Sequence, residues 1–478
     1  METFKKHHLT VISFIILVNT IIFSSTFVES CNPIDKEALV EFKRRIEYDD
    51  SYQLLTWNTK TDCCTSWNFV KCDNATGRVI EIHPFRPTDD IDLDISIFVK
   101  GTISPFLGNL TYLKVLNLHH FQQYYVDHPA GLRGQIPPQL GQLSQLTYLS
   151  LASNILTGSI PTSFANLHHL ETLDLGLNRL SGAIPSTLFQ SMKSLESLYL
   201  EQNDFTGSIP SSIANLIPLE TLSLNNNSFS GSIPSNIGKL KNLKYVYMSY
   251  NRISGNIPDS IGQLSKLEYL KLDNNRLTQS LPSSIGKLSK LISLHLNNNK
   301  INGPIPSSIS GLVSIFDILL SENDITGPIP SSIVNIMSLT NLDLTRNSIS
   351  GEIPSNIGKL KNLESIELSY NQIGGKIPDS IGQLSQLFTI KLDNNKLIGP
   401  IPNSISNLSR LYNLKLDHNK LNGSIPSKVL NIERLEVLDL SNNQLSGRIP
   451  PHKSIFPASA FSGNIGLCDA PLPPCKRS

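Results

Sequence analysis

Residues 170–185 read Leu170-Glu171-Thr172-Leu173-Asp174-Leu175-Gly176-Leu177-Asn178-Arg179-Leu180-Ser181-Gly182-Ala183-Ile184-Pro185. The same skeleton, L-x-x-L-x-L-x-x-N-x-L-x-G-x-I-P, recurs along most of the chain, and its asparagine falls at positions 154, 178, 203, 227, 251, 275, 299, 323, 347, 371, 395, 419 and 443. Each step is 24 residues except the one between Asn178 and Asn203, which is 25 because the segment Phe189-Gln190-Ser191-Met192 carries one extra residue. A fixed period of this length is typical of a protein built from stacked, equivalent units.

This repeat predicts a leucine-rich-repeat solenoid, an α/β fold in which right-handed coils stack and place a parallel β-sheet on the concave face. The alternation in L-x-L is typical of a short strand whose leucines point into the coil. We expect the asparagine to lie buried at the bend, where its amide both donates and accepts and satisfies backbone groups of adjacent coils. Counting two irregular coils near the beginning, we expect about fifteen strands, the first at residues 79–82.

Four segments are expected along the chain. Residues 1–30 have the charged start, the apolar run and the small residues of a signal peptide, and the alternative is a retained anchor helix. Residues 31–78 form a cysteine-containing amino-terminal cap, residues 79–451 the solenoid, and residues 452–478 a carboxyl-terminal cap with a cysteine pair. No second apolar stretch is long enough to span a bilayer, so we expect a soluble, secreted product without membrane insertion after signal cleavage.

The amino-terminal cap contains one predicted helix and two tryptophans. Residues 35–46 have helical apolar spacing, with Asp35 as the candidate N-cap. Trp57 and Trp67 flank a pair of adjacent cysteines, and we expect both to pack over the first coil.

The six cysteines all lie outside the repeats: Cys31, Cys63, Cys64, Cys72, Cys468 and Cys475. An even number in a secretory context predicts disulfides, here at the two ends of the core. Adjacent Cys63 and Cys64 are not expected to pair with each other. A zinc site is disfavoured because the spacing is wrong and the compartment is oxidising.

One coil carries an insertion. From Leu118 to Gly134 is 16 residues, whereas the equivalent step from Leu151 to Gly158 is 7, so nine residues are extra. They lie within His119-His120-Phe121-Gln122-Gln123-Tyr124-Tyr125-Val126-Asp127-His128. The three histidines and Asp127 allow a metal site, but we favour a polar, aromatic rim loop, with protein contact as its more plausible use.

The sequence also contains a longer repeat. Residues 342–421 closely match residues 222–301 at an offset of 120, or five coils. For example, Lys271-Leu272-Asp273-Asn274-Asn275 recurs as residues 391–395. This pattern indicates an internal duplication.

The concave surface is defined by the residue between the two strand leucines: Ser150, Asp174, Tyr199, Ser223, Tyr247, Lys271, His295, Leu319, Asp343, Glu367, Lys391, Lys415 and Asp439. The column before it adds Tyr245 and Tyr269, so we expect a tyrosine patch, defined as Tyr245, Tyr247, Tyr269, Lys271 and His295, on strands about 5 Å apart. Tyrosine is frequent at binding hot spots, although exposed tyrosine is also common in sheets on propensity alone. A second, acidic set comprises Glu171, Asp174, Glu196 and Glu201, and is expected to be a solvated face rather than a site for a basic partner.

Several classes of function are disfavoured. The motifs G-x-S-x-G, H-E-x-x-H and G-x-x-x-x-G-K-[ST] are absent, and no carboxylate pair stands out, so we expect no enzyme, no cofactor and no metal. The formal net charge of +1 gives no electrostatic case for nucleic acid. Five N-x-S/T sequons predict a glycoprotein: Asn74, Asn109, Asn226, Asn407 and Asn422. Asn226 lies on the expected inner surface, where a glycan would block part of it.

The G-x-I-P half of each coil, the cap residues Trp57, Cys63, Cys64, Trp67 and Cys72, and the closing cysteine pair resemble the plant-specific class of extracellular leucine-rich repeats. Without a kinase domain, the layout is most similar to DNA-damage-repair/toleration-like proteins and to polygalacturonase-inhibiting proteins of the cell wall. The resemblance implies the pairs Cys31–Cys63, Cys64–Cys72 and Cys468–Cys475, a second sheet beside the concave one, and binding on the concave face. The chain departs from the inhibitors in having more coils, and from the repeat at Gln279 and Leu281, which replace the usual glycine and isoleucine.

We therefore expect a plant recognition protein, secreted to the apoplast or cell wall, that binds a protein, peptide or cell-wall ligand in defence or cell-wall signalling. A membrane receptor kinase is the partner expected for signalling. The alternative is inhibition of a microbial cell-wall hydrolase such as polygalacturonase. Ice binding is a further alternative, but it needs a uniform column of threonine or asparagine, and the concave columns are mixed.

Overall fold

The structure is a computed structural model that describes residues 30–49, 54–83, 99–119, 131–452 and 455–475. The expected signal peptide and nearly all of the insertion fall outside these ranges. The chain divides into two compact units: unit 1 comprises residues 1–156 with 166–170, and unit 2 comprises residues 157–165 with 171–478. Within the described ranges, none of the helices has the length and apolar character needed to span a bilayer.

Unit 1 contains the cap and the first coils. Its elements are α2 (Pro33–Arg44), β1 (Ile46–Asp49), β2 (Val70–Cys72), β3 (Val79–Ile82), β4 (Val99–Thr102), β5 (Val115–Asn117), β6 (Gly131–Gln135) and β7 (Tyr148–Ser150). The strands β3, β5 and β7 are parallel, and β2 pairs antiparallel with β3, so the sheet begins in the cap. The first solenoid strand is therefore where the repeat predicts it.

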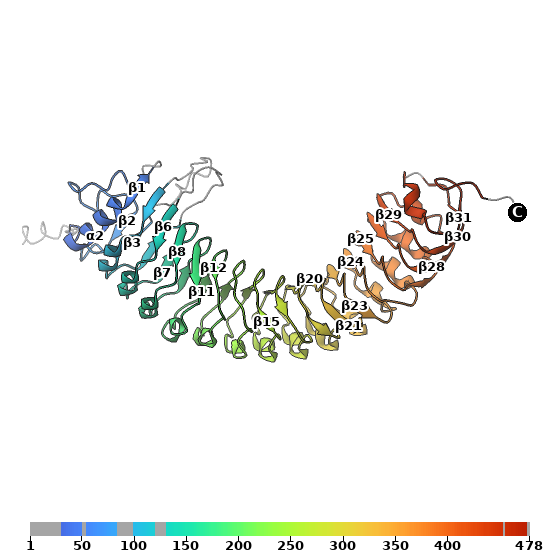
Figure 1. Ribbon diagram of the computed structural model, residues 1–478, viewed down its shortest axis with the longest axis horizontal. Coiled ribbons are helices and arrows are strands. Elements are labelled where there is room, and N and C mark those ends of the chain that lie inside the picture. Colours follow the sequence, from blue (N-terminus) through green and yellow to red (C-terminus); the bar gives the residue numbers. More distant parts are fainter. Residues whose placement is uncertain (1–29, 50–53, 84–98, 120–130, 453–454, 476–478) are drawn as a thin grey trace, which may run out of the picture. The chain divides into compact units, whose positions relative to one another are not determined.

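Unit 2 continues the repeat with one short strand per coil (Figure 1). These strands are β9 (Thr172–Asp174), β11 (Ser197–Tyr199), β13 (Thr221–Ser223), β14 (Tyr245–Tyr247), β16 (Tyr269–Lys271), β18 (Ser293–His295), β20 (Asp317–Leu319), β22 (Asn341–Asp343), β24 (Ser365–Glu367), β25 (Thr389–Lys391), β27 (Asn413–Lys415) and β29 (Val437–Asp439). They pair in parallel in chain order, and short 3-10 helices such as Ser283–Lys287 lie on the opposite side of each coil. Three such strands in unit 1 and twelve here confirm the predicted fifteen among the described residues.

The second sheet implied by the resemblance is present in pieces. In unit 2 its strands are β10 (Arg179–Gly182), β12 (Asp204–Phe205), β15 (Ser254–Gly255), β17 (Arg276–Leu277), β19 (Asn302–Gly303), β21 (Asp324–Pro328), β23 (Ser348–Ser350), β26 (Ile398–Gly399), β28 (Lys420–Gly423), β30 (Gln444–Arg448) and β31 (Gly466–Cys468). Most of these coils place a glycine with positive φ here, as at Gly255 (φ 75°) and Gly303 (φ 70°). Gln279 takes the same conformation with φ 63°, so the departure seen in the sequence keeps the backbone shape at the expense of strain.

The repeat asparagines hold adjacent coils together. The side chain of Asn323 is 8% exposed, and its Nδ2 donates to the carbonyl oxygens of Leu296, Leu320 and Ser321 at 2.9, 3.1 and 3.1 Å. Its Oδ1 accepts from the backbone N–H of Ile301 at 3.0 Å. One side chain thus satisfies four buried backbone groups, two of them in the preceding coil. This confirms the role that the sequence predicts for the asparagine.

The hydrogen bonds of the repeat asparagines, which we call the asparagine ladder, also locate the extra residue before Asn203 and the insertion before Asn154. In a regular coil, Nδ2 reaches a carbonyl 27 residues earlier, whereas Asn203 reaches one 28 residues earlier. The extra residue lies in a segment whose Phe189 and Met192 side chains are both buried, so the coil accommodates it while the segment stays packed on the core. Asn154 reaches Leu118, 36 residues earlier, and its Oδ1 accepts from Leu132, the usual 22 residues earlier. The difference of 36 − 27 = 9 confirms the nine inserted residues and places them between Leu118 and Leu132.

The ladder extends one step beyond the sequence prediction. Asn464, 21 residues after Asn443, accepts from the N–H of Leu445 and donates to the carbonyl of Leu440. The carboxyl-terminal cap is therefore attached by the same device as the coils.

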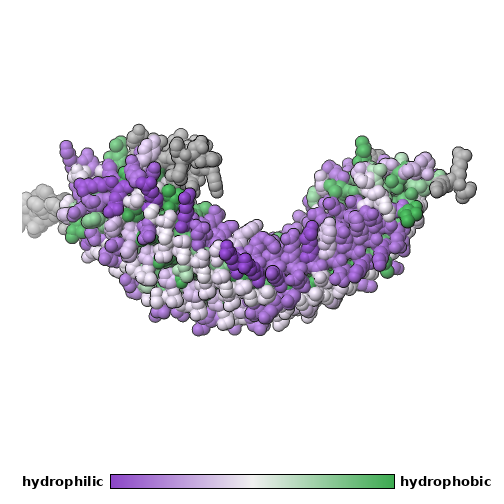
Figure 2. Space-filling view, in the orientation of Figure 1, coloured by the Kyte–Doolittle hydropathy of each residue, from purple (hydrophilic) through white to green (hydrophobic). Residues whose placement is uncertain are grey.

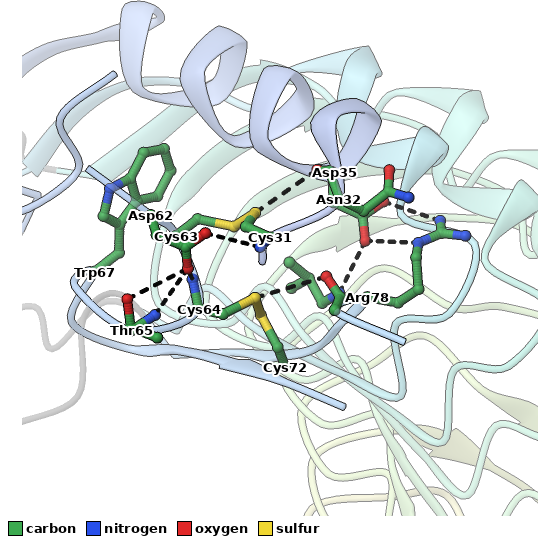
Figure 3. The surroundings of a disulfide bond; sticks show 12 residues. Cys31, Asn32, Asp35, Asp62, Cys63, Cys64, Thr65, Trp67, Cys72 and Arg78 are labelled. Carbon is green, nitrogen blue, oxygen red and sulfur yellow. Dashed lines mark hydrogen bonds and ion pairs between the residues drawn. A yellow bond between two sulfur atoms is a disulfide. The ribbon is translucent and has the colours of Figure 1, made fainter. Parts of the chain in front are cut away.

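The cap helix begins earlier than the sequence suggested, and the assignment of Asp35 as its N-cap was wrong. The helix spans Pro33–Arg44 because the side chain of Asn32 accepts from the N–H of Ile34, and Pro33 suits the first turn. Ile46 belongs to β1, which pairs antiparallel with β4. Asp35 is fully buried and instead binds the guanidinium of Arg78 and the N–H of Val79 (Figure 3).

The disulfides pair as the resemblance implied: Cys31–Cys63, Cys64–Cys72 and Cys468–Cys475. Figure 3 shows the two amino-terminal bridges side by side beneath the helix, close to Asp62. The sulfur atoms of Cys31, Cys63 and Cys64 are near enough together to suggest a metal site, but all three are bonded in disulfides. The rings of Trp57 and Trp67 stack with centroids 5.4 Å apart, and both residues are buried, which confirms their packing role.

We predict that Asp35→Ala destabilises the cap by about 3 kcal/mol, because it leaves the guanidinium of Arg78 without its buried carboxylate. Both tryptophans of the chain lie in this cap, so urea unfolding followed by tryptophan fluorescence reports on it directly. Glu37→Ala, at an exposed position of the same helix, is the control. Equal unfolding midpoints for the two variants would contradict the importance of the ion pair.

Asn323→Ala is expected to lower the free energy of unfolding by about 2 kcal/mol, because the buried N–H of Ile301 is left unpaired and three carbonyl oxygens each lose one of their two donors. Urea unfolding of the full chain, followed by far-ultraviolet circular dichroism, measures the change. Asp324→Ala, at the exposed neighbouring position, should shift the midpoint far less. A loss of the same size in both variants would show that the ladder is dispensable.

Candidate functional site

The tyrosine patch lies on three consecutive strands of unit 2. Tyr245 is in register with Tyr269, and Tyr247, Lys271 and His295 are in register across β14, β16 and β18. The alternate side chains of these strands, Val246, Leu270 and Leu294, are buried in the coils. The structure therefore brings all five predicted residues together on the concave face, as the period of two along each strand requires.

The three tyrosines form one cluster. Their ring centroids lie 6.3 Å apart for Tyr245 and Tyr247, 5.7 Å for Tyr245 and Tyr269, and 6.5 Å for Tyr247 and Tyr269. All three side chains are half-buried, so each ring packs against its neighbours and stays partly exposed to solvent. Such rings offer large contact area with little entropy left to lose on binding.

A hollow of about 420 Å³ opens beside the cluster. It is lined by Asn225, Asn226, Tyr247, Ser249, Tyr250, Lys271, Asp273 and His295. Ser249 and Asp273 lie two residues beyond Tyr247 and Lys271, so the same period of two could have identified them from the sequence. Tyr250 could not be found in this way, because its left-handed backbone (φ 56°) turns it out of the strand pattern.

The floor of the hollow is fixed by hydrogen bonds. Asp273 is 8% exposed, and its Oδ1 accepts from the hydroxyl of Ser249 at 2.5 Å. Its Oδ2 accepts from Nδ2 of Asn274 at 2.7 Å. Both carboxylate oxygens therefore have partners within the protein, and the polar floor is already assembled without a ligand.

The ionisable groups around the hollow differ in charge at neutral pH. Burial, and then the nearby Lys271, lower the pKa of His295 below its ordinary value of 6.5, so its ring is neutral. The charge of Glu268 raises the pKa of Tyr245, and burial raises that of Tyr247, so both phenols keep their protons. Lys271 is then the cation of this hollow, and its Nζ lies 5.8 Å from the ring centroid of Tyr247.

The side chains of the hollow are suited to binding. His295 shares a hydrogen bond of 2.8 Å with the hydroxyl of Ser293, which is the one serine–histidine pair of the patch. Ser293 is only 3% exposed, so its hydroxyl is not presented to a substrate. The groups that do reach the hollow are aromatic faces, amides, an ammonium and a neutral imidazole, which together provide contact area and polar selectivity.

Other predicted positions have mixed outcomes. All five sequon asparagines are exposed, and Asn226 lines the hollow, as expected for the inner surface. The acidic set is not a uniform solvated face, because burial raises the pKa of Glu201 and its Oε2 is buried. Of the insertion, only His119 falls among the described residues, so the metal and contact-loop interpretations stay predictions.

A larger hollow, of about 620 Å³, lies at the carboxyl-terminal cap around Ile449, Phe456 and Pro471. Figure 2 shows that the visible face of unit 2 is hydrophilic over most of its length and that hydrophobic residues gather near this end. Arg448 and Asp469 lie 3.6 Å apart in its lining, so the charged groups there neutralise each other. It therefore offers fewer polar groups for selectivity than the tyrosine patch.

Comparison with known families agrees with this architecture. Residues 95–244, 227–326 and 330–451 match the family described as leucine-rich repeat region, and residues 32–73 match the leucine rich repeat N-terminal domain. Together these matches cover most of the chain.

Two curated plant relatives share part of the chain. The DNA damage-repair/toleration protein DRT100 of Arabidopsis thaliana is 33% identical over 130 residues, and a polygalacturonase inhibitor of Pyrus communis is 31% identical over 137 residues. These stretches are 27% and 28% of this chain, and they span only 33% and 35% of the two relatives.

Solved structures show a broader likeness. The TDR receptor has a TM-score of 0.68 and 30% identity, and the match covers 73% of this chain and 59% of that chain. The ectodomain of the receptor kinase GASSHO1/SCHENGEN3 from Arabidopsis thaliana, solved with CASPARIAN STRIP INTEGRITY FACTOR 2, has a TM-score of 0.59 and 33% identity, with 79% and 50% covered. Both likenesses agree with a leucine-rich-repeat solenoid, and the second is to a plant receptor ectodomain solved with its ligand.

The lowered pKa of His295 makes a prediction about stability. Just below pH 6.5 the unfolded chain binds a proton at this residue more readily than the folded one, so stability falls as the pH drops through this window. We expect the loss of unfolding free energy between about pH 7.5 and about pH 5, which spans the ordinary histidine range, to be smaller in His295→Gln than in the native protein. His168→Gln, at an exposed position, is the control. An unchanged loss in His295→Gln would contradict the assignment.

Proposed function

Because this chain belongs to the leucine-rich-repeat proteins, we propose that it is a secreted plant recognition protein that binds a protein or peptide ligand at its tyrosine patch. The observation that supports this most is the cluster of three tyrosine rings beside a hollow whose polar floor is already hydrogen-bonded. Rigid aromatic groups around a pre-formed hollow are the composition of a binding hot spot. The proposed use is defence or cell-wall signalling, with a membrane receptor kinase as the candidate partner.

The extracellular location has two supports. All cysteines of the chain are in disulfides, which persist in oxidising compartments. The similar plant proteins include extracellular receptor domains and polygalacturonase inhibitors. The signal peptide at residues 1–30, the division into caps and solenoid, and glycans at the exposed sequons Asn74, Asn109, Asn407 and Asn422 belong to the same proposal. Binding in the hollow requires that Asn226, which lines it, carries no glycan.

Three other ligands are alternatives to a signalling protein or peptide. Inhibition of a microbial polygalacturonase is favoured by the similarity to polygalacturonase inhibitors, although the matched stretch covers 28% of this chain. A cell-wall glycan could also stack on the tyrosine rings. Ice binding has less support, because β14, β16 and β18 mix tyrosine, lysine, serine and histidine instead of repeating one small polar residue.

The test uses the secreted full chain and the variant Tyr245→Ala/Tyr247→Ala/Tyr269→Ala to capture proteins and peptides from plant apoplastic fluid and from a panel of fungal polygalacturonases. Its matched control is the same triple alanine substitution 120 residues later, at Ser365, Glu367 and Thr389. We expect the tyrosine variant to bind the captured ligand at least about tenfold more weakly, a loss of ~1.4 kcal/mol, while the control binds as the native protein does.

The identity of what is captured separates the uses. Capture of a peptide or a receptor ectodomain supports signalling, and loss of polygalacturonase activity on mixing supports inhibition. Equal capture by all three proteins would remove the tyrosine patch from the proposal and make the insertion at 119–128 the next candidate.

A further inference from the structure

The internal duplication provides a reference surface within the same protein. The hollow beside the tyrosine patch belongs to the first block, residues 222–301, and its counterpart in the second block lies 120 residues later. The floor is the same in both blocks. Ser249 and Asp273 correspond to Ser369 and Asp393, and in each block the serine hydroxyl donates to the aspartate. The two surfaces therefore share the serine–aspartate floor and differ in the side chains that surround it.

The lysine above this floor has a carboxylate partner in one block and lacks one in the other. In the second block, Nζ of Lys391 lies 2.9 Å from the carboxylate of Glu367. In the first block, Lys271 occupies the equivalent position, but Tyr247 stands where Glu367 would be. Across the described part of the chain, Lys271 forms no ion pair.

The neighbouring tyrosine differs in the same way. In the second block, the guanidinium of Arg346 lies 4.6 Å from the ring centroid of Tyr370 and 3.9 Å from the carboxylate of Glu322. In the first block Asn226 takes the place of Arg346, and in the coil before it Gln202 takes the place of Glu322. Tyr250, the counterpart of Tyr370, is 56% exposed, and no cation among the described residues lies over its ring.

The charge balance follows from these differences. Two ion pairs, Glu322 with Arg346 and Glu367 with Lys391, neutralise these four charges on the second surface, where Lys415 stands in place of His295. The first block has lost both acids and the arginine, and has kept the lysine. The acids that remain near Lys271 are already engaged: Asp273 binds Ser249 and Asn274, and Asp317 accepts from Asn341 at 2.6 Å. Glu268 faces Tyr245, whose pKa it raises.

We propose that the hollow of the first block binds a carboxylate of a peptide ligand, with Lys271 as its ion-pair partner and the rings of Tyr247 and Tyr250 against the apolar part of the same residue. This inference rests on the proposed function, because it names the ligand group that the tyrosine patch accepts. The ligand carboxylate takes the place that Glu367 occupies in the second block.

Two features favour a singly charged group. The hollow offers one ammonium beside a buried aspartate, so a dianion would meet repulsion that one lysine does not offset. The side-chain amides of Asn225 and Asn226 supply neutral donors in the same lining, which suit a carboxylate oxygen. The rings and the ammonium together recognise an acidic residue or a chain end with an apolar neighbour.

The probe is a library of synthetic decapeptides made in three matched forms. The first form has a free carboxyl terminus, the second has an amidated terminus with Asp or Glu inside, and the third has an amidated terminus with Asn or Gln at those positions. We expect peptides of the first or second form to be selected by the native full chain, and the form that wins identifies the source of the carboxylate. Equal selection of the third form would overturn the inference.

Variants test the residue assignment. Lys271→Gln is expected to weaken binding of the selected peptides at least tenfold. Lys391→Gln, at the matched position of the second block, should leave their affinity unchanged. Tyr247→Glu recreates the ion pair of the second block within the protein and is expected to abolish binding of the carboxylate forms. Unfolding midpoints of the three variants confirm that each is folded.

The outcomes separate this inference from the proposed function. If peptides bind the native protein and lose affinity in the triple tyrosine variant but not in Lys271→Gln, the patch is a binding site and the carboxylate assignment is wrong. If no form of the library binds, the inference is overturned, and the capture of proteins by the tyrosine patch decides the proposed function separately.

Discussion

The asparagine side chain at the bend of each coil is the interaction on which the rest of the structure depends. Its amide group forms hydrogen bonds with backbone groups of its own coil and of the preceding coil. These backbone groups are buried and cannot bond to water instead. Each of these groups would cost about 1–3 kcal/mol if it were left unpaired. Because the same contacts recur from Asn203 to Asn464, the ladder fixes the offset between coils, and that offset sets the spacing of the strands.

A constant frame makes the surface residues interchangeable. Leucines and the asparagine define the coil, so the residue between the strand leucines can change without altering its backbone. The two duplicated blocks show this directly, since Tyr247 and Glu367 occupy equivalent strand positions above the same serine–aspartate floor. In the second block Glu367 forms an ion pair with Lys391, whereas the first block presents aromatic rings and a lysine that has no such partner among the described residues. Function in this architecture is therefore decided by the differences between coils that share a fold.

Much of the fold could be predicted because the repeat is periodic, and the failures have physical causes. The strand positions and the extra residues follow from the period of the repeat. The packing of the cap tryptophans was predicted from their place beside the cysteine pair, and the disulfide pairs followed from the resemblance. The helix start was misplaced because Asp35 has the composition of an N-cap, while its true partner, Arg78, is 43 residues away. Asn464 was missed because its step of 21 breaks the period. In the candidate site the strand residues were predicted, but Tyr250 was not, because its position depends on a left-handed turn.

The central claim is that the binding surface is assembled before any ligand arrives. Hydrogen–deuterium exchange of the free protein tests it most directly, by comparing residues 245–251 and 269–275 with their duplicates, residues 365–371 and 389–395. If the surface is pre-formed by the asparagine ladder, the amides of both blocks exchange equally slowly without ligand, and Asn251→Ala speeds exchange in the first block alone. Fast exchange of residues 245–251 and 269–275 in the free native protein, with slow exchange in their duplicates, would contradict this account and show that the ligand itself orders the site.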